Sequence, residues 1–247
     1  MSSNRRVAVV TGASSGFGAA TARALHRVGF DLVLGARREG RLRVLAEPLD
    51  ARYARLDVTD PASVESFCAA LDRVDLLVNN AGNAFGAESV AAADETKWTA
   101  MFELNVLGVL RMTRALLPRL LASGDGLVVN VGSIAGFEVY PGGAGYSASK
   151  HALRALTRTL RLELLGQPIR VTDIAPGMAQ TEFALVRFDG DAERARKLYA
   201  GMTPLVAEDI AEAISWVATR PAHVNIDELV IRPRDQASAT LVHRHNA

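Results

Sequence analysis

A tyrosine and a lysine stand four residues apart in the segment Tyr146-Ser147-Ala148-Ser149-Lys150. In a helix, that spacing places both side chains on one face. A free tyrosine has a pKa of about 10, which is too high for a base at neutral pH. A nearby ammonium favours the phenolate and lowers this pKa, and proton transfer works best with a pKa near the operating pH. The pair could therefore exchange a proton with a bound molecule, although most such pairs are surface coincidences.

Two further polar residues could act with this pair. Ser133 follows the apolar run Gly126–Val131 and stands 13 residues before Tyr146. It could donate a hydrogen bond to a substrate oxygen at the carboxyl edge of a sheet, where open α/β sheets bind ligands. Asn105 lies between Leu104 and Val106 in a predicted helix, so its amide needs a buried partner. The alternative is that Asn105 is a structural residue that kinks the helix.

A glycine-rich loop, Thr11–Gly18, comes directly after an apolar run and opens a predicted helix. Gly12 permits a tight turn, Gly16 lets the backbone approach a diphosphate, and Gly18 lets the helix pack close to the sheet. The N-terminus of the helix would offer free N–H groups to phosphates. The loop lacks Gly-Lys-Ser/Thr, which disfavours a nucleotide triphosphatase. The alternative is a glycine-rich turn without a ligand.

The second predicted strand ends in Ala36-Arg37-Arg38 and carries no acid at its end. Proteins that bind NAD place an Asp or Glu there for the ribose hydroxyls, whereas an Arg accommodates a 2′-phosphate. A guanidinium binds phosphate through paired, charge-assisted hydrogen bonds. The sequence therefore favours NADP(H) over NAD(H). The alternative is that both arginines only face solvent at the start of a helix.

Short apolar runs rich in β-branched residues alternate with longer amphipathic stretches. Seven runs are predicted to be strands buried on both faces: Arg6–Val10, Asp31–Ala36, Arg52–Leu56, Val74–Asn79, Gly126–Val131, Ile169–Ile174 and Glu228–Ile231. Helices are predicted near residues 16–28, 39–47, 61–71, 94–122, 145–166 and 207–219. This alternation predicts an α/β, doubly wound Rossmann-type fold, with a seven-stranded parallel sheet flanked by helices on both faces. We expect residues 1–247 to form a single domain, with a substrate lid at 178–204.

Composition excludes several other classes of protein. The chain has 247 residues, of which 49% are hydrophobic, so it can bury a large core. A formal net charge of +1 gives no general attraction to nucleic acid or to an anionic membrane. No apolar run is long enough for a signal peptide or a membrane span. Cys68 is the only cysteine and the histidines lack ligand-like neighbours, so we expect no disulfide, no metal site and a cytoplasmic location.

The motifs above occur together with others in a characteristic order, and the chain resembles the short-chain dehydrogenase/reductase family, in its single-domain branch of about 250 residues. The matching pieces are Thr11–Gly18, Asp57-Val58, Asn79-Asn80-Ala81-Gly82, Asn105, Ser133, Tyr146 with Lys150, and Pro176-Gly177 with Thr181. The C-terminal run Asn225–Pro233 resembles one sub-branch, the NADP-dependent 3-hydroxy acid (serine-type) dehydrogenases.

The resemblance implies a role for each catalytic residue. Tyr146 would donate the proton in reduction and accept it in oxidation. Lys150 would lower the pKa of Tyr146 and hold the nicotinamide ribose. Ser133 would orient and polarise the substrate carbonyl. Asn105 would hold a water that continues the proton relay to solvent.

The resemblance also implies a cofactor site built from several loops. Asp57 and Val58 would flank the adenine, although Asp57 could instead cap the following helix. Asn79 would be more structural than its neighbours. The full set of cofactor-binding residues would be Gly12, Ser14, Ser15, Gly16, Phe17, Gly18, Arg37, Arg38, Asp57, Val58, Asn80, Ala81, Gly82, Tyr146, Lys150, Pro176, Gly177 and Thr181.

The substrate pocket is predicted to combine one wall of the cleft with the lid. Its expected residues are Ser133, Ala135, Phe137, Tyr140 and Tyr146 from the wall, and Met178, Phe183, Phe188 and Tyr199 from the lid. Arg187 could meet a substrate carboxylate, but we expect it to be an exposed lid residue. The helices 94–122 and 145–166 carry apolar residues beyond one stripe, which favours a homodimer or homotetramer over deeper burial in one subunit.

We therefore expect an NADP(H)-dependent oxidoreductase that acts on CH–OH groups. It would transfer a hydride between the nicotinamide and a carbonyl or secondary alcohol of a small molecule, with a 3-hydroxy acid as one candidate. A non-catalytic NADP(H)-binding sensor is the alternative, but it would not need Asn105, Ser133, Tyr146 and Lys150 together. A sugar-nucleotide epimerase would need a larger C-terminal substrate region.

Overall fold

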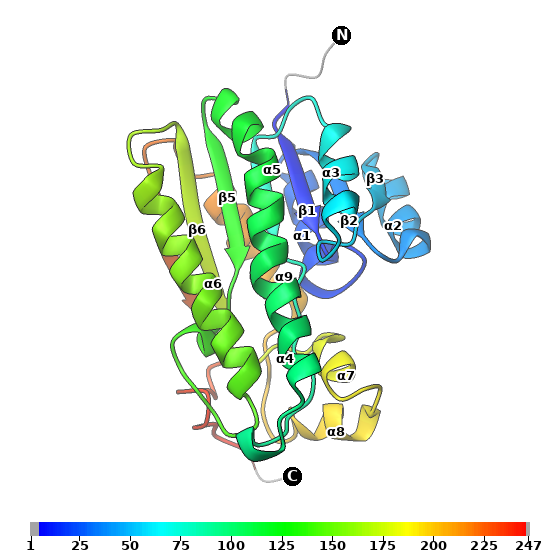
Figure 1. Ribbon diagram of the computed structural model, residues 1–247, viewed down its shortest axis with the longest axis vertical. Helices are drawn as coiled ribbons and strands as arrows, with labels where there is room; N and C mark the ends of the chain where they lie inside the picture. The colour runs from blue at the N-terminus through cyan, green and yellow to red at the C-terminus, as the bar shows by residue number, and fades with distance from the viewer. Residues whose placement is uncertain (1–4, 246–247) are drawn as a thin grey trace.

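The strands of the computed structural model, which describes residues 5–245, form one parallel sheet (Figure 1). The strands are β1 (Val7–Thr11), β2 (Asp31–Ala36), β3 (Arg52–Arg55), β4 (Leu76–Asn79), β5 (Gly126–Val131), β6 (Ile169–Pro176) and β7 (Glu228–Ile231). Their order across the sheet is β3-β2-β1-β4-β5-β6-β7, and every neighbouring pair is parallel. The predicted seven-stranded, doubly wound parallel sheet is confirmed.

Helices cover both faces of this sheet (Figure 1). They are α1 (Gly16–Arg27), α2 (Glu39–Ala46), α3 (Pro61–Ala69), α4 (Glu95–Phe102), α5 (Gly108–Ala122), α6 (Ala144–Glu163), α7 (Phe183–Arg187), α8 (Ala192–Lys197) and α9 (Ala207–Ala218). Leu25 of α1, Leu42 of α2 and Ile214 of α9 belong to one core cluster. Phe67 of α3 and Leu116 of α5 belong to another. The two clusters lie on opposite faces of the sheet because successive strand side chains alternate in direction.

The strand positions explain where the burial prediction succeeds and where it fails. All five residues of β1 are buried, as expected for a central strand with helices on both faces. The prediction of burial on both faces is wrong for β3, whose four residues are all exposed. It is also wrong for β7, in which Val230 is exposed and the other three residues are only partly buried. These two strands are the edges of the sheet, so each has a neighbour on one side only.

Two predicted segments have more internal structure than expected. The helix predicted over 94–122 is divided into α4 and α5 by a π-helical turn, η3, over Glu103–Leu107. Asn105 lies inside this turn. The predicted lid at 178–204 contains α7 and α8 and lies beyond the carboxyl ends of the strands (Figure 1).

A chain of buried polar side chains joins β4, β5 and two helices. Asn79 Nδ2 donates to Asn130 Oδ1 at 2.9 Å and to Thr113 Oγ1 at 3.1 Å. Asn130 Nδ2 donates to Thr157 Oγ1 at 2.9 Å. Buried polar groups need partners, so these bonds fix how α5 and α6 sit on the central strands. Because Tyr146 and Lys150 lie on α6, the same bonds also position these two residues.

Replacing Asn130 by alanine is expected to lower the free energy of unfolding by about 2–4 kcal/mol, because it removes two buried hydrogen bonds and leaves a small cavity. Urea denaturation measures the change. Glu65→Ala, on the exposed face of α3, is the control and should change stability by no more than about 0.5 kcal/mol. An equally small effect of Asn130→Ala would show that the polar chain does not hold the layers together.

Candidate active site

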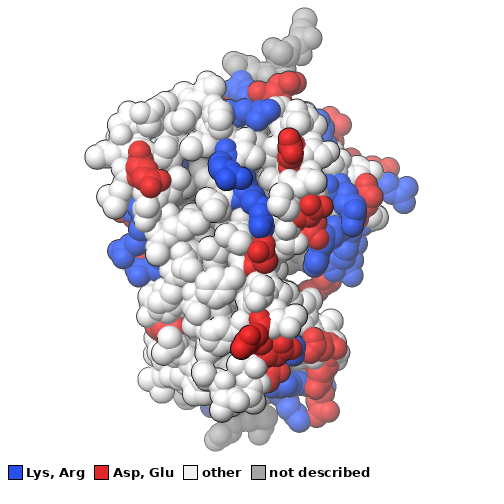
Figure 2. Space-filling model, in the orientation of Figure 1, with Lys and Arg blue, Asp and Glu red and all other residues white. Residues whose placement is uncertain are grey.

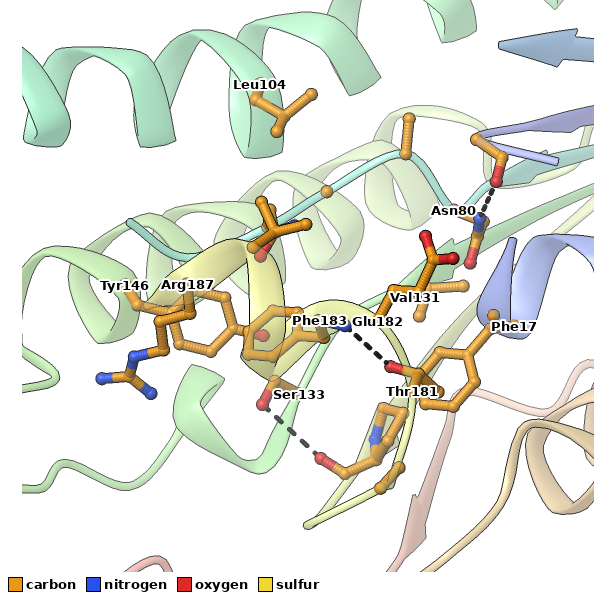
Figure 3. A pocket seen from close by; sticks show the side chains of 18 of the residues that line it. Phe17, Asn80, Leu104, Val131, Ser133, Tyr146, Thr181, Glu182, Phe183 and Arg187 are labelled. Atoms are coloured by element: carbon orange, nitrogen blue, oxygen red, sulfur yellow. Dashed lines mark hydrogen bonds between the residues drawn. The ribbon is translucent and has the colours of Figure 1, made fainter. Parts of the chain in front are cut away.

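A cleft of about 450 Å³ opens at the carboxyl edge of the sheet, beneath the lid (Figure 3). This volume lies in the range of small-molecule sites. The predicted site residues that line it are Gly12, Ser14, Ser15, Gly16, Phe17, Arg37, Arg38, Asp57, Val58, Asn80, Ala81, Gly82, Ser133, Ala135, Tyr140, Tyr146, Lys150, Pro176, Gly177, Met178, Thr181 and Phe183. Of the residues predicted for the site, Gly18, Asn105, Phe137 and Phe188 do not line the cleft.

The strand order reverses between β1 and β4, and the glycine loop lies at this point. Gly12 and Gly16 have φ angles of 65° and 50°, a region that side chains other than glycine rarely adopt. The first turn of α1 has no side-chain cap, so its backbone N–H groups remain free for an anion. The loop therefore has the conformation that the sequence predicted for a diphosphate site.

Asn80 holds the glycine loop against the end of β4. Its Nδ2 donates to the carbonyl oxygen of Thr11 at 2.9 Å, and Thr11 Oγ1 accepts from the backbone N–H groups of Asn80 and Ala81, each at 3.0 Å. A Cβ on Gly18 would come within 2.5 Å of Asn80 Nδ2. Gly18 thus serves close packing, which is the role that its position in the loop predicted, and its assignment as a cofactor contact stays a prediction.

The two arginines after β2 have different surroundings. Arg38 donates from Nε to Ser14 Oγ at 3.1 Å and from Nη2 to Ser15 Oγ at 2.6 Å. Its Nη1 donates to Glu182 Oε2 at 2.9 Å. Arg37 makes no hydrogen bond or ion pair with any residue between 5 and 245, and its charge acts on Asp57. The alternative that Arg38 only faces solvent is wrong, because its guanidinium joins the glycine loop to the lid.

Asp57 follows β3 and lines the cleft next to Val58. Its Oδ1 accepts from the backbone N–H of Thr59 at 3.0 Å and from Thr59 Oγ1 at 2.7 Å. The cap of α3 is Asp60, whose Oδ1 accepts from the backbone N–H of Ala62 at 3.0 Å. The alternative that Asp57 caps this helix is therefore wrong.

Tyr146 and Lys150 lie on one face of α6, as the spacing predicted, with Lys150 Nζ 5.8 Å from the centroid of the tyrosine ring. Burial raises the pKa of Tyr146, Tyr140 adds to this increase, and hydrogen bonding to Ser133 opposes it. Lys150 is not among the groups that shift this pKa, so the lowering that the resemblance implies stays a prediction. The ammonium instead donates to the carbonyl oxygen of Val131 at 2.7 Å. The phenol is therefore protonated at neutral pH.

Lys150 is itself buried, and burial lowers its pKa to about 8. The negative charge of Asp173 on β6 acts in the opposite direction. Burial raises the pKa of Asp173 to about 6, and the Lys150 ammonium opposes that shift. Asp173 was not predicted for the site, because in the sequence it is one polar residue inside an apolar strand.

Asn105 has buried hydrogen-bond partners and also lies where the helix is irregular, in the π-helical turn. Its Nδ2 donates to the carbonyl oxygen of Asn83 at 2.8 Å and to Ser149 Oγ at 3.0 Å, and its Oδ1 accepts from the backbone N–H of Asn83 at 2.9 Å. The π-helical turn brings this amide to the loop after β4. A Cβ on Gly82 would lie 2.9 Å from Asn105 Oδ1 and 3.6 Å from Lys150 Nζ. Asn105 therefore lies just behind the cleft rather than in its wall.

The lid contributes aromatic and charged groups to the cleft. The ring of Phe183 meets that of Tyr146 edge-on, with centroids 5.5 Å apart. Arg187 lines the cleft and is only 7% exposed, so the expectation of an exposed lid arginine is wrong. Its guanidinium donates to the carbonyl oxygens of Gly86 and Gly142 and to Tyr140 Oη, at 2.9–3.0 Å. The stick view shows Arg187 beside Tyr146 (Figure 3).

Two predicted pocket residues lie outside the cleft. Phe137 packs against the guanidinium groups of Arg154 and Arg232. Phe188 packs against those of Arg187 and Arg194. Tyr199 does line the cleft, and its hydroxyl donates to the carbonyl oxygen of Ala179 at 2.7 Å.

Sequence reasoning missed Glu182 and Gln236, which both line the cleft. Gln236 comes from the tail after β7, and its Oε1 accepts from the backbone N–H of Met178 at 2.8 Å. No local pattern marks either residue, because each is brought to the cleft only by tertiary packing.

In the part of the chain that the structure describes, no group of three His, Cys, Asp or Glu side chains is arranged to hold a metal ion. None of the helices between residues 5 and 245 has the combined length and apolar character of a membrane span.

Comparison with known proteins places these features in a family. A family model described as short chain dehydrogenase matches residues 6–190. The chain is 46% identical over 240 residues to sulfoacetaldehyde reductase 2 of Chromohalobacter salexigens. The aligned residues make up 94% of this chain and 95% of that relative. This chain is also 43% identical over 246 residues to the NADP-dependent 3-hydroxy acid dehydrogenase of Salmonella typhi. That alignment covers 96% of this chain and 99% of the relative.

A solved structure gives the same result. The closed form of serine dehydrogenase complexed with NADP⁺ matches with a TM-score of 0.92 and 41% identity, covering 96% of this chain and 99% of that one. The match to the family model takes in the glycine loop, Ser133 and the helix that carries Tyr146 and Lys150. The predicted resemblance is confirmed, and this chain belongs to the short-chain dehydrogenase family.

Proposed function

We propose that this chain uses NADP(H) to transfer a hydride between the nicotinamide and a carbonyl or secondary alcohol of a small anionic molecule, such as a 3-hydroxy acid. The observation that carries the proposal is that Tyr146, Ser133 and Lys150 line the same cleft as the glycine loop. Relatives named sulfoacetaldehyde reductase and 3-hydroxy acid dehydrogenase support the same class of reaction.

The residues at the switch between β1 and β4 fit a phosphorylated dinucleotide. A Cβ on Gly12 would come 2.9 Å from Ala81 Cα, so the open space along this loop depends on glycine. Arg38, held by Ser14 and Ser15, lines the same cleft as Arg37, and the two supply guanidinium groups for a 2′-phosphate. When bound, the nicotinamide supplies or accepts the hydride. The remaining chemistry is proton transfer and belongs to the chain.

We assign proton transfer to Tyr146. Its raised pKa keeps the phenol protonated at neutral pH, which is the form that donates to a carbonyl oxygen as an alcohol forms. The Ser133 hydroxyl would donate to the same oxygen and polarise it. Lys150, whose pKa is lowered only to about 8, is largely charged at neutral pH. Its ammonium would stabilise the phenolate that remains after donation.

We assign to Asn105 the positioning of a water behind the cleft. The absence of a side chain at Gly82 leaves a space between Asn105 Oδ1 and Lys150 Nζ. Of the hydrogen-bonding capacity of the amide, both N–H groups and one lone pair of Oδ1 are engaged. The second lone pair could accept from a water that also contacts Lys150, which would continue the proton path from the tyrosine.

Arg187 supports an anionic substrate. A buried guanidinium ordinarily has a carboxylate partner, because an unpaired buried charge is costly. Among the described residues, Arg187 has only neutral acceptors: two carbonyls and the Tyr140 hydroxyl. These three bonds leave two of its five N–H groups for a ligand. A carboxylate or sulfonate on the substrate would provide the missing charge.

We also propose that the protein is a cytoplasmic homodimer or homotetramer that pairs through α4, α5 and α6. Figure 2 shows a largely uncharged surface over α6. Leu110 on α5 and Leu162 on α6 are exposed large hydrophobic residues. Sedimentation analysis that returned only a monomer would exclude this assembly.

Replacing Tyr146 by phenylalanine is expected to reduce turnover by at least about a hundredfold and to leave the affinity for NADPH nearly unchanged, because only the hydroxyl is lost. Steady-state kinetics on a panel of alcohols and carbonyls, together with fluorescence titration of NADPH, measures both. Retained turnover would remove the tyrosine from the mechanism. Tight NADPH binding by the wild type without turnover of any substrate would favour the alternative, a non-catalytic sensor.

Replacing Arg38 by glutamine is expected to weaken NADPH binding by about tenfold or more and to spare NADH, because the lost guanidinium bonds are charge-assisted. The matched control is Arg43→Gln, which removes an exposed arginine from the same helix. Wild-type affinity for NADH equal to or tighter than that for NADPH would defeat the proposed coenzyme.

Replacing Arg187 by methionine is expected to raise KM for serine or 3-hydroxypropionate by about tenfold or more, because the substrate loses its charge partner. The kcat/KM for an uncharged short alcohol should not fall. Arg187→Lys, which keeps the charge, should recover part of the loss. Equal losses for charged and uncharged substrates would indicate a purely structural arginine, and wild-type activity confined to bulky ketones would exclude the anionic substrate class.

A further inference from the structure

Glu182 reaches from the lid to the arginines that follow β2. Its Oε2 accepts from Arg38 Nη1 at 2.9 Å, and its Oε1 accepts from Arg41 Nη1 at 2.6 Å. Residue 182 directly precedes α7, whereas both arginines belong to the opposite side of the cleft. The carboxylate therefore connects the lid to the rim of the cleft.

The same carboxylate lies where the proposed coenzyme needs free cations. Arg38 already donates to Ser14 and Ser15, so Glu182 takes the third side of its guanidinium. A phosphate ester carries a charge of about −1.5 to −2 at neutral pH and needs paired N–H donors. A carboxylate and a phosphate on the same guanidinium would also repel each other. The carboxylate and the phosphate therefore compete for Arg38, and binding of one must displace the other from at least part of the guanidinium.

The ion pair is weak enough for the phosphate to displace it. The side chains of Arg38 and Glu182 are 44% and 41% exposed, and exposed pairs of this kind contribute little to stability. Arg41 is more exposed still, at 52%. A dianionic phosphate that arrives with the rest of a dinucleotide has the larger charge and is positioned by many other contacts. It is therefore expected to replace the carboxylate.

We propose that Glu182 is an internal competitor for the 2′-phosphate and thereby a determinant of coenzyme specificity. In the free protein it occupies Arg38 and Arg41 and fastens the lid over the rim of the cleft. A coenzyme with a 2′-phosphate releases the lid at this point, and one without it does not. This inference rests on the proposed use of NADP(H).

The position of Glu182 relates this release to the substrate end of the cleft. The next residue is Phe183, whose ring meets that of Tyr146 edge-on. Arg187, which we assign to the substrate anion, ends the same short helix. A phosphate that displaces Glu182 thus acts on the element that carries two groups of the substrate pocket.

The experiment measures binding rather than turnover. Isothermal titration calorimetry at fixed ionic strength gives the dissociation constants of 2′,5′-ADP and 5′-AMP for the wild type, Glu182→Gln and Glu193→Gln. Glu193 lies on α8 and pairs with Lys197, so the control removes the same charge from the lid away from the two arginines. Glu182→Gln is expected to bind 2′,5′-ADP about threefold to tenfold more tightly than the wild type. The affinity for 5′-AMP should be the same in all three proteins.

Hydrogen exchange provides a second reading of the same variants. Backbone amides of α7 should exchange faster in Glu182→Gln than in the wild type, and addition of 2′,5′-ADP should accelerate them in the wild type alone. Slower exchange on addition of 2′,5′-ADP would contradict release of the lid.

An unchanged or weaker affinity of Glu182→Gln for 2′,5′-ADP would overturn the inference, and so would an equal gain for 5′-AMP. These results are distinct from failure of the proposed coenzyme, which is read from the wild type alone. A wild-type protein that binds 2′,5′-ADP no more tightly than 5′-AMP would remove the 2′-phosphate site and this inference with it.

Discussion

The reversal of strand order between β1 and β4 is the constraint on which the site depends. The chain leaves β1 toward β2 and β3 and returns to the other side of β1 as β4, so the connections after β1 and β4 run in opposite directions and leave a gap. Asn80 and the Thr11 hydroxyl bridge the two ends by hydrogen bonds. This contact fixes the glycine loop without filling the gap. The glycines at 12 and 18 then follow, because a side chain at either position would meet the Asn80 amide.

A second consequence of this arrangement is that polar groups lie where the core would otherwise be apolar. Asn79 and Asn130 occupy central strands, and each buried amide is bonded to other side chains. Lys150 and Asp173 are also buried, and each charge moves the pKa of the other back toward its ordinary value. Burial of such groups opposes folding unless they are paired. The opposite charge of Asp173 therefore favours the charged form of Lys150 next to Tyr146.

Much of the fold and the centre of the site follow from local sequence patterns. Apolar runs mark the strands because both faces of a parallel sheet are covered, and Tyr146 and Lys150 share a face because they are one helical turn apart. The edge strand β3 is not marked by an apolar run. Its residues, Arg52-Tyr53-Ala54-Arg55, have a neighbouring strand on one side only, and their side chains are exposed. The π-helical turn at Asn105 could not be read from periodicity, since Asn105 makes its contacts there with Asn83 and Ser149, which lie far from it in the sequence.

Charged residues of the lid were the hardest to predict, for a physical reason. A charge in a surface segment usually faces water, so the sequence indicated an exposed Arg187 and did not mark Glu182 at all. Their roles depend on partners far away in the chain: Gly86 and Tyr140 for the arginine, Arg38 and Arg41 for the glutamate. Two opposite charges at the two ends of one five-residue helix leave little freedom for the helix to move at one end alone. In the proposed function, anions at the coenzyme end and at the substrate end of the cleft would therefore act on this one short helix rather than on two independent loops.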